Sequence, residues 1–147
     1  MLTGIHHTSI TVSDMELSIA FYRDLLGFTP IWDSRALGLV FEGPMADAVT
    51  GCPGTSQRLV FLEVRGQRLE LVEYTPTGKA QVGNKPSDTG SVHVCFLTDD
   101  IEELHGRLAE NEVVLHCAPQ TIGETKVFYF RDPDGVVLEV MGGKPIV

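Results

Sequence analysis

Two histidines and two glutamates stand in positions where their side chains could bind a metal ion. His7 and His93 lie in strand-like runs, and Glu70 and Glu139 each lie between aliphatic residues of a further strand-like run. Because side chains alternate along a strand, each of the four falls on the face opposite the aliphatic residues of its strand. A glutamate among aliphatic residues is costly to bury without a partner. One divalent cation would partner both carboxylates and both imidazoles.

The ligand types narrow the choice of metal. Imidazole and carboxylate ligands with room for water suit Zn, Ni, Co, Mn or Fe, whereas Mg or Ca would favour oxygen ligands throughout. Taken singly, a strand histidine is usually packed or exposed, and a strand glutamate is usually solvated. The symmetric set of four is what favours a metal site.

The chain carries an internal repeat. Residues 7–17 resemble residues 93–104, since in each segment a histidine is followed seven positions later by an aspartate that opens a helical pattern. Further along, residues 68–72 resemble residues 137–140, and each segment carries a lone glutamate among aliphatic residues. Each half is therefore predicted to contain a strand, a helix and then several strands.

The repeat predicts one α+β domain built from two modules, at 1–74 and 91–147. The segment between them, 75–90, is rich in proline, glycine and polar residues and is expected to be a connector. A length of 147 residues fits one domain or two tightly joined half-domains.

Local signals place the elements that must position the site. Ser13 and Glu16 fit a capping box at the start of the first helix, and the second helix is expected to start at Asp99 or Asp100. Strands are predicted over residues 59–64, 67–74, 126–131 and 136–141. Residues 42–57 are expected to form a long loop with one helical turn, which could close over a substrate as a lid.

Several neighbouring residues are assigned structural roles. His6 is expected on the face opposite His7. Cys95 shares a face with His93 and is interpreted as a small buried hydrophobic residue, with a place in the lining of the cavity as the alternative. Glu63 and Glu73 are expected on solvated faces.

Composition limits the function classes. The net charge is −9 and the pI about 4.9, which disfavours nucleic acid as a partner. No apolar run approaches the ~20 residues of a membrane span, and no signal peptide is expected. Three cysteines without a CxxC motif disfavour a disulfide framework or a zinc ribbon. A cytoplasmic protein is expected.

With these residues in place, the chain resembles the vicinal oxygen chelate superfamily, the group of glyoxalases, bleomycin-resistance proteins and dioxygenases. The resemblance covers essentially the whole chain and is carried by Ile5–His7, Val12–Asp14, Ser18–Phe28, Leu69–Leu71, Val92–Val94 and Phe130–Glu139.

The resemblance implies two βαβββ modules whose mixed sheets form a cup around one metal ion. It carries the family's ligands over onto His7, Glu70, His93 and Glu139. Members of the family bind two adjacent oxygens of a small substrate and stabilise an enediolate-like intermediate. A glutamate can then move the proton on carbon, a role that Glu139 is expected to take, with Glu70 as the alternative.

The function expected from this resemblance is that of an isomerase or lyase of the glyoxalase or epimerase type. Glu70–Tyr74 departs from the corresponding glyoxalase I segment, whereas Val49–Gly54 is similar to a loop of cyclitol epimerases. One alternative is an extradiol-type Fe(II) dioxygenase. A fourth protein ligand at Glu70 would crowd the iron positions that such an enzyme leaves open for catechol and dioxygen. Another is a drug-binding protein without catalysis. A homodimer is expected, with the site either inside one chain or shared by two.

Overall fold

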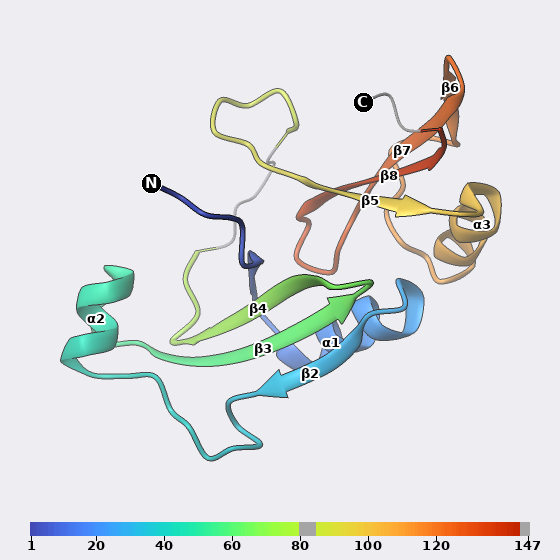
Figure 1. The fold of residues 1–147 in the computed structure, drawn as a ribbon. Coiled ribbons are helices and arrows are strands. Elements are labelled where there is room, and N and C mark those ends of the chain that lie inside the picture. Colours follow the sequence, from blue (N-terminus) through green and yellow to red (C-terminus); the bar gives the residue numbers. More distant parts are fainter. Residues whose placement is uncertain (80–84, 145–147) are drawn as a thin grey trace. The chain divides into compact units, whose positions relative to one another are not determined.

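A computed structural model of the chain describes residues 1–79 and 85–144. The chain forms two compact units, Met1–Lys79 and Ala80–Val147 (Figure 1). The boundary between the units falls inside the expected connector at 75–90, of which residues 80–84 lie outside the described part.

The first unit is a four-stranded mixed sheet with its helices on the connections. Its elements in chain order are β1 (Thr8–Val12), α1 (Met15–Ala20), η1 (Phe21–Leu25), β2 (Thr29–Asp33), α2 (Pro44–Thr50), β3 (Ser56–Val64) and β4 (Gln67–Thr75). The strand order is β1-β4-β3-β2. Strand β1 runs parallel to β4, and the other neighbours are antiparallel.

The second unit repeats this plan. Its elements are β5 (Val94–Thr98), α3 (Ile101–Glu110), β6 (Gln120–Ile122), β7 (Thr125–Arg131) and β8 (Val137–Gly143). The strand order is β5-β8-β7-β6, with β5 parallel to β8 and the other pairs antiparallel. The predicted α+β class and the βαβββ order of each module are therefore confirmed.

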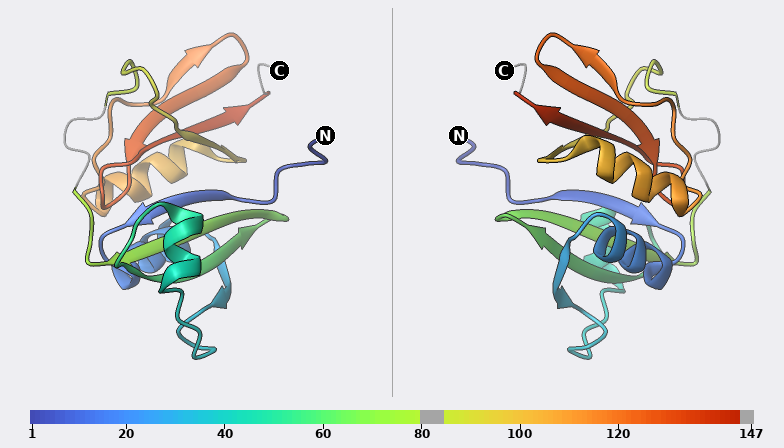
Figure 2. Two further views of the ribbon diagram at one scale, coloured as in Figure 1. Left: turned by 90° about the vertical axis from the view of Figure 1, so that its left-hand side faces the viewer. Right: turned by 90° about the vertical axis from the view of Figure 1, so that its right-hand side faces the viewer.

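The apolar core of each unit lies on the helix side of its sheet. Helix α1 packs on β4, and α3 packs on β8 (Figure 2). Leu69 and Leu71 of β4 are buried on the α1 side, and Leu138 and Val140 of β8 are buried on the α3 side. Because side chains alternate, each strand presents its central glutamate to the opposite face.

The first helix begins one residue later than a cap at Ser13 would require. The Asp14 side chain accepts a hydrogen bond from the Leu17 N–H at 3.0 Å, so Asp14 is the N-cap and the predicted capping box is wrong. In the second unit Asp100 caps α3 in the same way, through the Glu103 N–H at 3.0 Å. Aspartate is as good a cap as serine, which explains the shift.

The described residues contain no helix whose length and apolar character would let it cross a membrane.

Candidate metal centre

The first unit brings His7 and Glu70 together. His7 immediately precedes β1, and Glu70 lies in the middle of β4, the parallel neighbour of β1. The distance between Nε2 of His7 and Oε2 of Glu70 is 3.3 Å. The Glu70 side chain is only 11% exposed, so its carboxylate is withdrawn from water beside a nitrogen donor.

The second unit brings His93 and Glu139 together in the same manner. His93 immediately precedes β5, and Glu139 lies in β8, the parallel neighbour of β5. Nε2 of His93 lies 3.0 Å from Oε2 of Glu139, whose side chain is 13% exposed.

The two pairs occupy equivalent positions of the repeat. In the first sheet Glu70 pairs with Ser9, two residues after the histidine, and in the second Glu139 pairs with Cys95, again two residues after the histidine. On its other side, each glutamate pairs with an aromatic residue of the antiparallel neighbour, either Phe61 or Tyr129. The same register of the parallel strands therefore places each glutamate beside the histidine of its unit.

Aromatic rings and a second histidine surround the first pair. The Phe61 ring meets the His7 and His6 rings edge-on, with centroid distances of 5.4 and 6.2 Å. Nδ1 of His6 lies 2.8 Å from Nδ1 of His7, so the prediction that His6 lies on the opposite face is wrong. The chain is not yet a strand at these residues, since β1 begins at Thr8, and the alternation rule does not apply to them.

The second pair has polar neighbours on both adjacent strands. In the sheet, Glu139 pairs with Cys95 on one side and with Tyr129 on the other. Burial, reinforced by the negative charge of Glu139, raises the pKa of the Cys95 thiol to about 12 and raises the pKa of the Tyr129 hydroxyl as well. Cys95 is therefore a half-buried neighbour of the carboxylate, rather than a core residue. The His116 ring stacks on Tyr129, and burial lowers the His116 pKa.

The donor set of each pair suits a divalent ion. A neutral imidazole nitrogen and a carboxylate oxygen are both ligands of Zn, Ni, Co, Mn and Fe, and each pair offers one of each. Within residues 1–79 and 85–144, no group of three or more histidine, cysteine, aspartate or glutamate side chains gathers around a point that could hold an ion. Each unit thus holds one histidine–glutamate pair, and the binding of one ion by all four residues stays a prediction.

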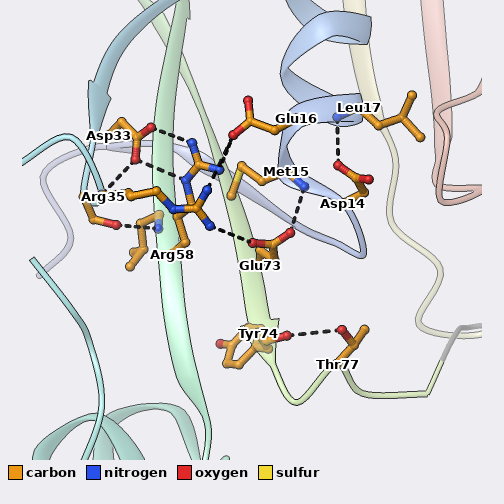
Figure 3. Close-up of polar contacts among 12 residues, drawn as sticks. Asp14, Met15, Glu16, Leu17, Asp33, Arg35, Arg58, Glu73, Tyr74 and Thr77 are labelled. Carbon is orange, nitrogen blue, oxygen red and sulfur yellow. Dashed lines mark hydrogen bonds and ion pairs between the residues drawn. The ribbon is translucent and has the colours of Figure 1, made fainter. Parts of the chain in front are cut away.

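Glu73 has a different role from the one expected. Its Oε1 accepts a hydrogen bond from the Met15 N–H at 2.9 Å, so it holds the start of α1 against β4 (Figure 3). Its side chain is 21% exposed, and Arg35 lies 3.9 Å away. The expectation of a solvated glutamate is therefore wrong, because the alternation that faces Glu70 away from α1 faces Glu73 toward it.

An arginine links three elements of the first unit on this helix side. Arg58 of β3 donates to Asp33 of β2 at 2.7 Å and to Glu16 of α1 at 2.6 Å (Figure 3). The hydrogen bond from Arg58 lowers the pKa of the Asp33 carboxyl. The Arg58 side chain is 11% exposed, which makes this a partly buried clamp. No local sequence signal pairs these three residues, since their contacts are long-range.

Comparisons with known proteins agree with the fold. The chain is 30% identical over 146 residues to the metallothiol transferase FosB of Staphylococcus haemolyticus, covering 97% of this chain and 86% of that protein. It is 26% identical over 137 residues to a probable lactoylglutathione lyase of Synechocystis, covering 92% of each. The crystal structure of a glyoxalase family protein from Bacillus cereus aligns with a TM-score of 0.83 at 22% identity, over 99% of this chain and 97% of that one.

A family model described as the Glyoxalase/Bleomycin resistance protein/Dioxygenase superfamily matches residues 4–140. That match takes in both His–Glu pairs and nearly all of both sheets. The chain belongs to this superfamily.

Proposed function

We propose that the protein is a divalent-metal-dependent isomerase or lyase of the glyoxalase or epimerase type. The observation that carries the proposal is the pair of equivalent contacts, His7 to Glu70 at 3.3 Å and His93 to Glu139 at 3.0 Å. A carboxylate mostly withdrawn from water needs a positive partner, and two such carboxylates at repeated positions call for a shared one.

One divalent ion, Zn, Ni, Co, Mn or Fe, would be held by His7, Glu70, His93 and Glu139. Bound there, it would supply Lewis-acid stabilisation of the negative charge that develops on two adjacent substrate oxygens. The relative named a metallothiol transferase supports a metal role for this scaffold.

Proton transfer at carbon is assigned to Glu139, with Glu70 as the alternative base. Glu139 lies between Cys95 and Tyr129 in the sheet, and its Oε2 lies 3.0 Å from Nε2 of His93. The contact with His93 orients a carboxylate whose side chain is only 13% exposed. A base held in one orientation at a water-poor site meets the geometric requirement for abstracting a proton next to a carbonyl.

The remaining features are proposed on general grounds. Residues 42–57 include α2, whose Met45 and Val49 are exposed apolar side chains, and this segment is the candidate substrate lid. The three cysteines are unpaired thiols, which favours a reducing compartment such as the cytoplasm. A homodimer acting on a small oxygenated molecule is the proposed working form.

The test combines metal analysis with hydrogen exchange at carbon. Wild type, E139Q and the control E124Q are purified without chelators and reconstituted with Ni, Co, Mn or Zn. Candidate substrates, such as the hemithioacetals of methylglyoxal and small 2-oxo acids, are then followed by NMR in D₂O.

Wild type and E124Q are expected to exchange the proton on carbon, and E139Q to lose at least ~100-fold in rate, the scale of a removed general base. Glu124 pairs with Lys144, and both side chains are 76% exposed, so its substitution removes one carboxylate charge and one exposed ion pair. Normal exchange by E139Q would remove Glu139 from the reaction.

A second candidate is a metal-dependent thiol transferase. The similarity to FosB, at 30% identity over 97% of this chain, favours it. The same protein samples distinguish the two, because a transferase consumes a thiol in proportion to product, whereas an isomerase or lyase turns over without net thiol loss.

A further inference from the structure

A line of polar contacts leads from the outside of the first sheet to His7. Nη1 of Arg68 lies 3.1 Å from Nε2 of His6, and Nδ1 of His6 lies 2.8 Å from Nδ1 of His7. Nε2 of His7 in turn lies 3.3 Å from Oε2 of Glu70. Arg68 and Glu70 are two residues apart in β4, so both point to the same face of the sheet.

The two ends of this line fix the hydrogens between them. A guanidinium can only donate, so Nε2 of His6 must accept from Arg68. The hydrogen of neutral His6 then lies on Nδ1, which donates to Nδ1 of His7. Neutral His7 therefore carries its hydrogen on Nε2, pointing at a carboxylate that can only accept. One tautomer of each ring satisfies all three contacts, and reversing either ring places two donors face to face.

We propose that Arg68 and His6 are positioning residues that hold His7 in the Nε2–H tautomer and thereby oppose metal binding at that nitrogen. The consequence for metal rests on the proposed function, whereas the tautomer itself belongs to the metal-free protein. A cation can bind Nε2 of His7 only after the hydrogen has moved to Nδ1. That change reverses His6 and sets its Nε2–H against Arg68.

The positive charge of Arg68 also opposes the binding of a cation at Nε2 of His7. The Arg68 side chain is 43% exposed, and its Nε lies 3.7 Å from Oε2 of Glu63. Glu63 is therefore a second partner of the guanidinium. Removing the guanidinium eliminates both the donor that fixes His6 and a positive charge near the ligand nitrogen. Arg68 thus sets the affinity of the site below what its ligands alone would give.

The first test reads the tautomer of His7 in metal-free protein. Long-range ¹H–¹⁵N correlation spectra are recorded at about pH 8.5, well above the usual imidazole pKa of ~6.5, on wild type, R68M, R68K, H6F and R65M. The phenylalanine of H6F keeps a ring against Phe61, and R65M removes a like charge at the adjacent hairpin turn.

In wild type and R65M the hydrogen of His7 is expected on Nε2. In R68M and H6F the signals should move to a mixture of both tautomers, and R68K, which keeps a donor, should restore the wild-type pattern at least in part. A hydrogen on Nδ1 of His7 in wild type, or a tautomer unchanged in both H6F and R68M, would overturn the proposal.

The second test measures the affinity for Zn²⁺ by competition with a chromophoric chelator. R68M is expected to bind Zn²⁺ about 10-fold more tightly than R65M, the scale of one outer-shell interaction but with the opposite sign. Equal affinities of R68M and R65M would overturn the opposing role. If wild type bound no divalent ion at all, the proposed function would fail, and the tautomer spectra would still decide whether the relay exists.

Discussion

At the scale of single residues, the two glutamates are placed by strand register and not by local sequence. Glu70 stands between Ser9 and Phe61 in its sheet, and Glu139 stands between Cys95 and Tyr129. The equivalent positions therefore differ in their ring neighbour, which is an apolar phenylalanine beside Glu70 and a hydroxyl-bearing tyrosine beside Glu139. This asymmetry favours a ligand role at Glu70 and the proton-transfer role at Glu139.

The Phe61 ring packs against the imidazoles of His6 and His7. Its substitution therefore tests how far metal affinity depends on the packing of His7. F61L is expected to keep the fold, because it retains a large apolar side chain at a half-buried position and so costs less than the roughly 3–5 kcal/mol of a Phe→Ala truncation in a core. The ring contacts to His6 and His7 would be lost. The affinity for Zn²⁺ should fall about 10-fold, measured by chelator competition.

The matched control is L59A, two positions earlier on the same face of β3. It removes apolar volume without touching either imidazole contact. An equal loss of affinity in both variants would attribute the effect to general loosening of the sheet.

The sequence could identify the candidate ligands but not the neighbours of His7. Alternation holds for Glu70 and Glu139 because both lie inside strands. It fails at His6 because strand geometry begins only at Thr8, and a residue pair before a strand has no fixed alternation. The predicted face of His6 is therefore wrong because the backbone before Thr8 is not extended as a strand, and the sequence pattern does not reveal this.

At the scale of elements, the Arg58 clamp ties β2, β3 and α1 of the first unit into one structure. R58M is expected to lower the free energy of unfolding by about 2 kcal/mol near neutral pH, the scale of hydrogen bonds between charged groups. Most of this belongs to Asp33, because the Glu16 side chain is 70% exposed and its ion pair is weak. Urea unfolding of wild type and R58M measures the difference.

The Arg58 contribution has a defined pH dependence. Asp33 has a folded pKa below its ordinary value of 3.8, so it contributes stability that is complete above 3.8 and is lost as the pH falls through the lower folded value. The difference between wild type and R58M should therefore shrink below about pH 4. R23M is the control, since Arg23 pairs with Asp24 at the surface with side chains about half exposed. A difference that grew in acid would contradict the assignment.

Glu73 anchors the beginning of α1 to β4, and its two substitutions separate the hydrogen bond from the charge. E73L removes the acceptor of the Met15 N–H and is expected to cost about 1 to 2 kcal/mol of unfolding free energy. E73Q keeps an acceptor oxygen and should retain most of the stability. Thermal unfolding followed by circular dichroism measures both, and equal losses would assign the effect to the charge alone.

The elements that the sequence did not predict are those with the weakest local patterns. Strand β6 has three residues, all exposed, and so presents no apolar alternation. Strand β2 is interrupted by a register shift between Pro30 and Trp32, which breaks the period of two. Helix α2 exceeds the single turn expected, with Pro44 at its start and Gly51 in a left-handed conformation at its end. The long strands, by contrast, were predicted within about three residues of their ends.

At the scale of the whole molecule, the proposed ion has a consequence that two independent sites would not have. His7 belongs to one compact unit and His93 to the other. If one ion takes ligands from both pairs, H7A and H93A should each lose nearly all of the roughly one divalent ion per chain expected for wild type, and the double variant should lose no more. Elemental analysis after reconstitution measures this, and retention of half the metal by each single variant would instead indicate two separate sites.

A shared ion must also couple the stability of the two units. A ligand that binds only the folded state stabilises it by about 2.7 kcal/mol when its free concentration is 100 times its dissociation constant. Saturating Zn²⁺ should therefore raise the thermal unfolding temperature of wild type, and H7A and H93A should both lose this shift although each alters a different unit. Mixing the two variant proteins after unfolding and refolding extends the test: the shift returns in part only if each site draws its pairs from two chains, because a mixed dimer then holds one intact set of ligands.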